Sequence, residues 1–286
     1  MEVHKEISLL RKKLKIHKNR NRSIGLVPTM GSLHSGHLSL VKKSLEQNEV
    51  TVCSIFVNPY QFNNPKDLEK YPRNHDEDLK LLEELGCQIA FCPEVREMYP
   101  SQPQATFDFE EIGKIMEGKY RQGHFHGVGL VVIKLFNVIE PDRVYFGEKD
   151  LQQLAIIRLL VKDFSYNIEI VSVPIVREES GLALSSRNIQ IPPETRSKAA
   201  IIYEGLQVGG KILANNGTPS EACLAVGEHI ANQKGLEIEY IECVEMDSFK
   251  ILTDKLTPRN IAICIAVIAG GVRLIDNVII RRVEQL

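Results

Sequence analysis

The sequence lacks three features that would point to particular classes of protein. Its net charge is only −2 over 286 residues, which gives no support for a nucleic-acid binder that neutralises phosphates. Its six cysteines include no C-x-x-C pair and several lie in apolar runs, which indicates reduced, buried thiols. No apolar window of about 18 residues occurs. We therefore expect a folded cytoplasmic protein without nucleic-acid or membrane partners.

What the sequence does contain is a regular alternation of strand-like and helical patterns. Helix-length segments separate apolar, strand-like runs at residues 23–30, 50–58, 87–93, 143–148 and 167–176. This alternation predicts right-handed crossovers and a doubly wound, parallel, Rossmann-like α/β sheet. Ligands of such sheets bind at the carboxyl ends of the strands.

The pattern changes near residue 176. A long helical pattern begins at about Pro193, and a second one covers residues 221–232. Two strand-like stretches, residues 236–246 and 260–280, follow without helices between them, which favours local antiparallel pairing. We therefore expect two domains, a Rossmann-like domain of residues 1–175 and a smaller C-terminal α+β domain of residues 176–286.

The stretch "LVPTMGSLHSGHLSLV", residues 26–41, joins the first of these strands to a helix. His34 and His37 lie three residues apart at the predicted helix N-terminus, where unpaired backbone N–H groups attract anions such as phosphate. Gly31 and Gly36 would let a nucleotide approach the backbone closely. By itself the H-x-x-H spacing is weak, and a pair of surface or metal-binding histidines is an open alternative, although neighbouring metal ligands are missing.

Further strings give this stretch a context. "HSGH" resembles the His-x-Gly-His signature of the nucleotidylyltransferase and class I aminoacyl-tRNA synthetase superfamily. "PTMGSLHSGHLSLV" resembles more specifically the pantothenate synthetases, or pantoate-beta-alanine ligases. Other strings match that family in order: "FVNPYQF" (56–62), "YPR" (71–73), "GHFHGV" (123–128), "YFGEKDLQQL" (145–154), "PIVREESGLALSSRN" (174–188) and, more weakly, "VRLIDN".

The resemblance implies an ATP-dependent ligase that condenses pantoate with beta-alanine. Pantothenate would form through a pantoyl-adenylate, with release of AMP and pyrophosphate. ATP would be the co-substrate and Mg²⁺ would accompany it, although the sequence does not reveal the metal ligands. Family resemblance also implies a homodimer and a C-terminal domain that closes over the active site. The acidic cluster at residues 76–78 is either a metal contact or the ordinary acidic first turn of a helix.

The resemblance also assigns site residues. The catalytic residues would be His37, His34, Lys149 and Arg187. Contacts with ATP would come from Met30, Gly31, Ser32, Leu33, His34, Ser35, Gly36, His37, Gly147, Glu148, Lys149, Asp150, Val176, Leu184, Ser185, Ser186 and Arg187. Contacts with pantoate or beta-alanine would come from Asn58, Gln61 and Gln153. Tyr71, Arg121 and His124 would shape the site.

Simpler readings stay open for several of these residues. By sequence alone Ser185 fits a helix N-cap or a turn, and the matching string around it favours the phosphate contact instead. Asp150 could be an N-cap and a ribose contact at once, and an isolated glutamine such as Gln61 most often lies on the surface. The chain departs from the family pattern at His126 and between residues 63 and 70, which leaves loop closure in doubt. Another adenylyl-transferring enzyme, either a nucleotidylyltransferase or an aminoacyl-tRNA synthetase relative, is the alternative function, and a non-catalytic nucleotide sensor is a third.

Overall fold

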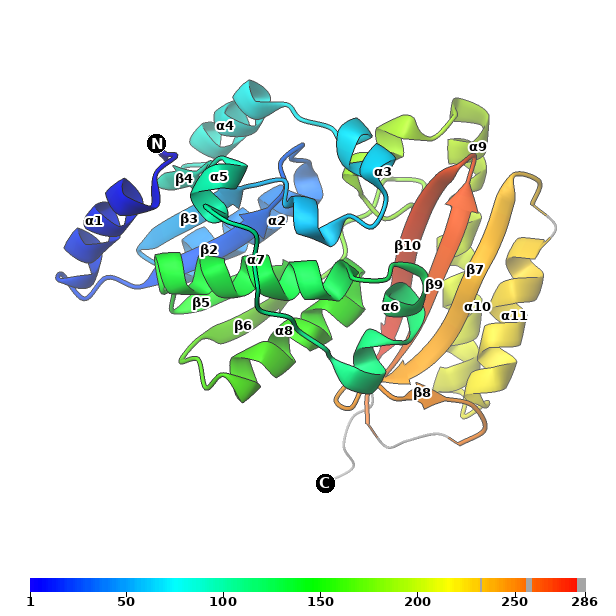
Figure 1. Ribbon diagram of the computed structural model, residues 1–286. Helices are drawn as coiled ribbons and strands as arrows, with labels where there is room; N and C mark the ends of the chain where they lie inside the picture. The colour runs from blue at the N-terminus through cyan, green and yellow to red at the C-terminus, as the bar shows by residue number, and fades with distance from the viewer. Residues whose placement is uncertain (232, 256–258, 282–286) are drawn as a thin grey trace. The chain divides into compact units, whose positions relative to one another are not determined.

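A computed structural model describes residues 1–231, 233–255 and 259–281 of the chain (Figure 1). The chain divides into two compact units, Met1–Glu148 with Ile156–Pro174, and Lys149–Ala155 with Ile175–Leu286. The boundary predicted between residues 175 and 176 lies one residue beyond Pro174, where the chain passes from the first unit to the second. The short segment Lys149–Ala155, however, belongs to the second unit although the sequence places it among the strands of the first. Contacts distant in sequence, such as that between Lys149 and Asn277, account for this difference.

The first unit is built on a six-stranded sheet in which every strand pairs in parallel. The strand order is β1-β4-β3-β2-β5-β6, so the direction of winding reverses between β2 and β5. This confirms the predicted Rossmann-like sheet, with β1 as an additional strand at one edge. The strands are β1 (Glu2–His4), β2 (Ile24–Thr29), β3 (Val50–Ile55), β4 (Ile89–Phe91), β5 (Arg143–Gly147) and β6 (Glu169–Val173).

Helices connect these strands, and Figure 1 shows α7 lying across them. The longer helices are α1 (Ile7–Lys18), α2 (Ser35–Gln47), α4 (His75–Glu84), α7 (His124–Ile139) and α8 (Leu151–Asp163). Shorter helical segments are η1 (Pro59–Gln61), α3 (Pro65–Lys70), α5 (Val95–Met98), η2 (Glu110–Gly113), α6 (Met116–Tyr120) and η3 (Glu148–Asp150). The nearly continuous apolar sequence of α7 reflects its burial, since most of its residues are inaccessible to solvent.

A row of buried side chains across the sheet holds α2 and α4 against one face. The row has one member from each of five strands: Val27, Cys53, Ala90, Tyr145 and Val173. Leu40 and Val41 of α2 and Leu82 of α4 pack in the same cluster. Burying a valine or leucine side chain contributes about 1.5–3 kcal/mol, so the strand ends that carry the candidate site project from a well-packed layer.

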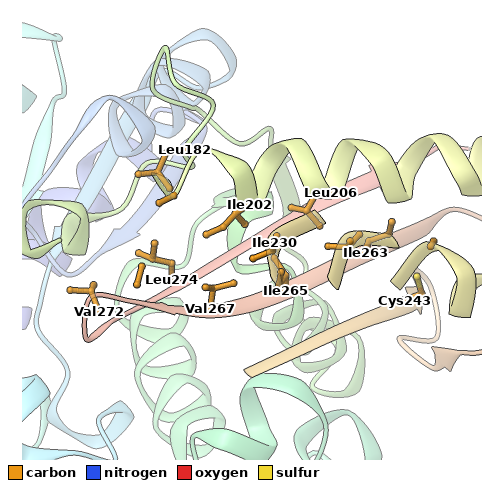
Figure 2. Close-up of a cluster of buried hydrophobic side chains, with 14 of the residues drawn as sticks. Leu182, Ile202, Leu206, Ile230, Cys243, Ile263, Ile265, Val267, Val272 and Leu274 are labelled. Carbon is orange, nitrogen blue, oxygen red and sulfur yellow. The ribbon is translucent and has the colours of Figure 1, made fainter. Parts of the chain in front are cut away.

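The second unit contains a four-stranded antiparallel sheet in the order β10-β9-β7-β8. Its strands are β7 (Leu236–Glu245), β8 (Ile251–Leu252), β9 (Ile261–Ala269) and β10 (Val272–Ile280), and its helical segments are η4 (Ser186–Gln190), α9 (Pro193–Lys198), α10 (Ile201–Ala214) and α11 (Pro219–Ala231). Helices α10 and α11 lie side by side against the sheet (Figure 1). Residues of these helices and of β7, β9 and β10 form one apolar core (Figure 2).

Two sequence expectations for this unit need correction. The run 260–280 is a hairpin, because Gly270 and Gly271 adopt φ values of +58° and +83° and turn the chain between β9 and β10. The long helix expected from Pro193 is two helices, α9 and α10, and nothing in the sequence marks the break between them. Among the described residues, no helix has both the length and the apolar character that a membrane span requires.

Candidate active site

The segment between β2 and α2 turns sharply just after the strand ends. Gly31 and Ser32 have φ values of +80° and +49°, in the left-handed region that only glycine adopts without strain. Thr29 supports the turn: its hydroxyl accepts a hydrogen bond from the backbone N–H of Gly31 at 3.2 Å and donates to the carbonyl of Ser54 at 2.7 Å. The turn thus directs the chain into α2, which begins at Ser35.

Both histidines of this segment cap α2. Nδ1 of His34 accepts a hydrogen bond from the backbone N–H of Gly36 at 3.1 Å, and Nδ1 of His37 accepts one from the backbone N–H of His34 at 3.4 Å. The rings lie 4.0 Å apart, centroid to centroid. An acceptor Nδ1 carries no proton, so the proton of each neutral ring is on Nε2. The capping bonds therefore fix Nε2 of both imidazoles as a hydrogen-bond donor.

The buried carboxylate of Asp78 binds the turn between β2 and α2. Asp78 of α4 is 2% exposed, and its two oxygens accept hydrogen bonds from the backbone N–H groups of Ser32 at 2.8 Å and Leu33 at 2.6 Å. A Cβ atom at Gly31 would lie only 2.8 Å from Oδ2 of Asp78. Burial raises the pKa of Asp78, and these backbone bonds oppose the shift. Sequence reasoning missed this role, because no spacing links Asp78 to a loop that precedes it by more than forty residues.

The segment after β3 presents two buried amides. Asn58 is inaccessible to solvent, and its Nδ2 donates to Oε1 of Gln61 at 3.1 Å and to the carbonyl of Gly127 at 2.9 Å. Oδ1 of Asn58 accepts a hydrogen bond from the hydroxyl of Tyr99 at 3.0 Å. Since Oε1 of Gln61 is held by Asn58, its Nε2 points the other way and lies 3.0 Å from Sδ of Met30. Gln61 is therefore an oriented, buried amide and not a surface glutamine.

The string "GHFHGV" supports this pair of amides. Nδ1 of His124 lies 2.8 Å from the carbonyl of Gln61, and Nε2 lies 3.0 Å from a guanidinium nitrogen of Arg121. Because a carbonyl only accepts and arginine only donates, the proton of His124 is on Nδ1. Arg121 in turn pairs with the buried Glu117 at 3.5 Å. This series of contacts fixes the backbone of Gln61.

Close packing between α7 and η1 has the same effect. A Cβ atom at Gly127 would lie 2.1 Å from the carbonyl oxygen of Tyr60 and 2.5 Å from the backbone nitrogen of Gln61. Only glycine at this position lets the two segments approach so closely. The unusual His126 has a separate contact, since its Nδ1 accepts a hydrogen bond from the backbone N–H of Phe107 at 3.1 Å. Tyr71 packs edge-on against Phe62, with 5.6 Å between ring centroids.

The candidate residues of the first unit share one edge of the sheet. Met30–His37 follow β2, Asn58 and Gln61 follow β3, and Gly147 and Glu148 lie at the end of β5. These three strands are parallel neighbours, and the winding reverses between two of them. Ligands of open α/β sheets bind at this position, beside the carboxyl ends of strands where the winding reverses.

The remaining candidates belong to the second unit. The ammonium of Lys149 lies 3.2 Å from Oδ2 of Asp150, and Gln153 is half-buried in the first turn of α8. The backbone N–H of Leu184 donates to the carbonyl of Val176 at 3.0 Å, which closes a hairpin-like loop. Ser185 caps η4 by accepting the backbone N–H of Arg187 at 3.3 Å, so the simpler reading of Ser185 as an N-cap holds. Ser186 is buried.

The structure therefore groups the predicted residues into a first-unit set and a second-unit set. Whether both sets act on one substrate stays a prediction. The acidic cluster supplies no metal cage, because the described residues contain no group of three or more His, Cys, Asp or Glu side chains placed to hold an ion. Asp76 and Glu77 are exposed, and both oxygens of Asp78 accept backbone N–H groups.

Comparison with known proteins identifies the family. Residues 2–279 match the pantoate-beta-alanine ligase family. The chain belongs to this family. The pantothenate synthetase of Cytophaga hutchinsonii is 47% identical over 275 residues, which cover 96% of this chain and 97% of that protein. The pantothenate synthetase of Bacteroides fragilis is also 47% identical, over 97% of this chain and 98% of its own length.

Solved structures of the same family share the fold of this chain. A pantothenate synthetase from Thermus thermophilus superimposes with a TM-score of 0.90 at 39% identity, covering 97% of this chain and 99% of that chain. A pantoate-beta-alanine ligase from Francisella tularensis, complexed with beta-gamma ATP and beta-alanine, gives a TM-score of 0.78 at 36% identity, with 97% of each chain covered. The match over nearly the whole length favours a ligase over the other adenylyl-transferring enzymes considered from the sequence.

Proposed function

We propose that this chain condenses pantoate with beta-alanine at the expense of ATP, forming pantothenate, AMP and pyrophosphate. Membership of the pantoate-beta-alanine ligase family supports the overall reaction. ATP and beta-alanine as ligands are supported by the Francisella tularensis relative, whose structure is complexed with beta-gamma ATP and beta-alanine. One observation in the chain itself carries the proposal. His34 and His37 cap α2 through Nδ1 and present their Nε2–H groups at the N-terminus of this helix, beside the edge of a parallel sheet.

The route we propose has two steps, each with a balanced transfer. A carboxylate oxygen of pantoate attacks the α-phosphorus of ATP, a new P–O bond forms, and pyrophosphate leaves with the electron pair of the broken bond. The amine of beta-alanine then attacks the carbonyl carbon of the pantoyl-adenylate, loses a proton and expels AMP. The first step is needed because a free carboxylate repels a nucleophile and lacks a good leaving group.

Charge stabilisation in the first step is the proposed role of His34 and His37. Negative charge grows on the phosphate oxygens as the carboxylate approaches, and preorganised N–H donors stabilise such charge without reorganising. The N-terminus of α2 adds unpaired backbone N–H groups and the positive end of its dipole. We assign the larger catalytic role to His37 and propose that residues Met30–Gly36 contact the nucleotide.

The buried amides after β3 suit pantoate. An amide both donates and accepts, which matches a ligand that carries hydroxyl groups and a carboxylate. The orientation of Gln61, fixed by Asn58 and His124, supports its assignment as the pantoate-reading residue. An oriented amide also discriminates, because an analogue without the matching group leaves it unpaired. Gln153 is proposed as a second pantoate contact.

The second-unit residues are proposed to act in the same adenylation step. Lys149 and Arg187 would neutralise phosphate charge, and the hydroxyls of Ser185 and Ser186 would donate hydrogen bonds to phosphate oxygens. The carboxylate of Asp150 would accept hydrogen bonds from the ribose hydroxyls. Further nucleotide contacts are proposed for Gly147, Glu148, Val176 and Leu184. Closure of the C-terminal domain stays a prediction.

Three finer aspects of the reading are proposals as well. Mg²⁺ is proposed to arrive bound to the phosphates of ATP, since the described residues form no cage for it, and magnesium often keeps few protein ligands. A homodimer is supported by the exposed apolar side chains of Val3, Leu9 and Ile16, two of which share one face of α1. A cytoplasmic location is supported by six free cysteines.

The test of the proposed function is product analysis by mass spectrometry with ATP, magnesium, pantoate and beta-alanine, omitting each acid in turn. Pantoyl-adenylate and pyrophosphate should form without beta-alanine, and nothing should form without pantoate. His37→Ala should slow adenylation by about 10² to 10³, the cost of one preorganised donor. His229→Ala, a histidine of α11 outside the candidate residues, is the control. Adenylation at the normal rate by His37→Ala would rule out its role.

A further inference from the structure

Strand β10 contains two adjacent polar residues that an apolar strand does not need. Asp276 and Asn277 are only 5% and 3% exposed. Their strand neighbours Val272 and Leu274 belong to the apolar core of the second unit (Figure 2). Burying polar groups is unfavourable unless hydrogen bonds satisfy them, so the partners of this pair show what it does.

Asp276 holds the loop that leads to the serines and arginine of the candidate site. Its two carboxylate oxygens accept hydrogen bonds from both terminal nitrogens of Arg177, at 2.6 and 2.9 Å. The guanidinium also donates to the carbonyl of Gly181 at 3.1 Å and lies 3.6 Å from the ring centroid of Tyr203. A two-pronged, stacked guanidinium has little freedom to move. Arg177 and Ala183 pair as a β-bridge at the base of the loop formed by residues 177–183. By holding Arg177, Asp276 therefore fixes both sides of the base of this loop.

Asn277 holds a different segment. Successive side chains of a strand point to opposite faces, so Asn277 projects away from the core face that Asp276 shares with Leu274. Nδ2 of Asn277 donates to the backbone carbonyl of Lys149 at 3.1 Å. Burial raises the pKa of Asp276, while Arg177 and Lys149 are close enough to oppose that shift. The ammonium of Lys149 is therefore close enough to Asp276 to interact with its carboxylate.

The loop has a second attachment that makes the arrangement rigid. Oε1 of Glu178 accepts hydrogen bonds from Nδ2 of Asn188 at 3.0 Å and from Arg196 at 2.8 Å. Asn188 lies directly after Arg187, so the segment of Ser185–Arg187 is held just beyond its end as well as at its base. Asp276 and Asn277 of β10 thus connect the loop before Ser185–Arg187 with the segment at Lys149, which is far away in the sequence.

We propose that Asp276 and Asn277 are positioning residues for adenylation, which set the place of Lys149 and of the Ser185–Arg187 segment relative to each other. The inference rests on the roles proposed for Lys149 and Arg187. It also gives a function to the string "VRLIDN", which had no assigned role. Alignment of donors with developing charge is worth a large factor in rate, and a displacement of about 1 Å can cost roughly 100-fold.

The variant that tests the inference is Asn277→Asp. It keeps the size of the side chain but replaces the donor that faces the Lys149 carbonyl with an acceptor. ATP–pyrophosphate exchange with pantoate, measured without beta-alanine, should slow by roughly 10- to 100-fold in kcat. Asn277→Ser, which keeps a donating hydroxyl, should lie between wild type and Asn277→Asp. This milder variant also tests the inference if Asn277→Asp does not fold.

Glu239→Gln is the matched control. It weakens another contact of the same strand, the half-buried ion pair of Glu239 with Arg273 at 2.6 Å. It should lower the melting temperature while exchange keeps its normal kcat. An equal loss of exchange in Glu239→Gln and Asn277→Asp would mean that both act only through stability, and would overturn the inference.

A double-mutant cycle separates this inference from the proposed function. In a Lys149→Ala background, Asn277→Asp should slow exchange by less than about twofold, because a residue that acts through another has no effect once that residue is removed. The same 10- to 100-fold loss in both backgrounds would overturn the inference. So would normal exchange by Asn277→Asp beside a slow Lys149→Ala, which would leave the role of Lys149 intact. Normal exchange by Lys149→Ala itself would instead refute the proposed role of Lys149, and the inference with it.

Discussion

Replacing Asp78 with asparagine should loosen the turn that carries the two histidines. The carboxylate accepts one backbone N–H on each oxygen, at 2.8 and 2.6 Å, whereas an amide has a single acceptor. One N–H of Ser32 or Leu33 then faces an NH₂ group. A hydrogen bond to a charged group contributes about 1.5–3 kcal/mol, and removing a buried charge returns part of that amount. At neutral pH these two effects largely offset each other, so we expect Asp78→Asn to change the free energy of unfolding by at most about 1 kcal/mol.

The effect on activity should exceed the effect on stability. A displaced turn moves the Nε2–H donors of His34 and His37 as well as the backbone N–H groups, so kcat/KM for ATP should fall roughly 10- to 100-fold. Urea unfolding and ATP–pyrophosphate exchange measure the two effects. Asp76→Asn and Glu77→Gln are the controls, because these exposed neighbours in the same turn of α4 should each change stability by at most about 1 kcal/mol. An equal fall in ATP–pyrophosphate exchange in all three variants would refute the reasoning.

The pH dependence of stability gives a separate readout of the same residue. Burial raises the pKa of Asp78 above its ordinary value of 3.8, so the folded protein binds this proton more tightly than the unfolded chain. The stabilisation from the bound proton is complete below the unfolded pKa and is lost as the pH rises through the folded pKa. The excess stability of wild type over Asp78→Asn should therefore fall with rising pH just above 3.8 and then level off. A rising excess would contradict the assignment.

Two further predictions concern packing and metal. Gly127→Ala should lower the free energy of unfolding by about 1–3 kcal/mol and raise KM for pantoate, because its Cβ would lie 2.1 Å from the Tyr60 carbonyl next to Gln61. The control is Gly210→Ala, the same change in α10, where the nearest atom is 3.7 Å away. An unchanged KM in Gly127→Ala would contradict the packing argument. EDTA should stop turnover without shifting the melting temperature, since the described residues form no metal cage; a fall of several degrees would show a structural ion.

The sequence predicted the parallel sheet well because strands buried on both faces leave long apolar runs. β1 escaped notice, since three residues are too few to show a period. The hairpin of β9 and β10 carried a readable signal, the Gly270–Gly271 pair, inside a run that looked continuous. The break between α9 and α10 carried none.

The candidate site divides in the same way. His34, His37, Asn58 and Gln61 follow strand ends, and the parallel sheet places the ends of neighbouring strands at one edge. The residues that hold them are harder to find, because Asp78 is an acidic residue in the first turn of a helix and fits that position without any further role. Only the folded chain shows that its oxygens accept the N–H groups of a distant turn.

The path of one oxygen atom tests the central claim most directly. Pantoate labelled with ¹⁸O in its carboxylate should be mixed with the protein, ATP, magnesium and beta-alanine, and the phosphate products analysed by mass spectrometry. If the carboxylate attacks the α-phosphorus and the amine later expels AMP, each AMP formed carries one ¹⁸O and pyrophosphate carries none. Unlabelled AMP, or label in pyrophosphate or inorganic phosphate, would contradict the adenylate route.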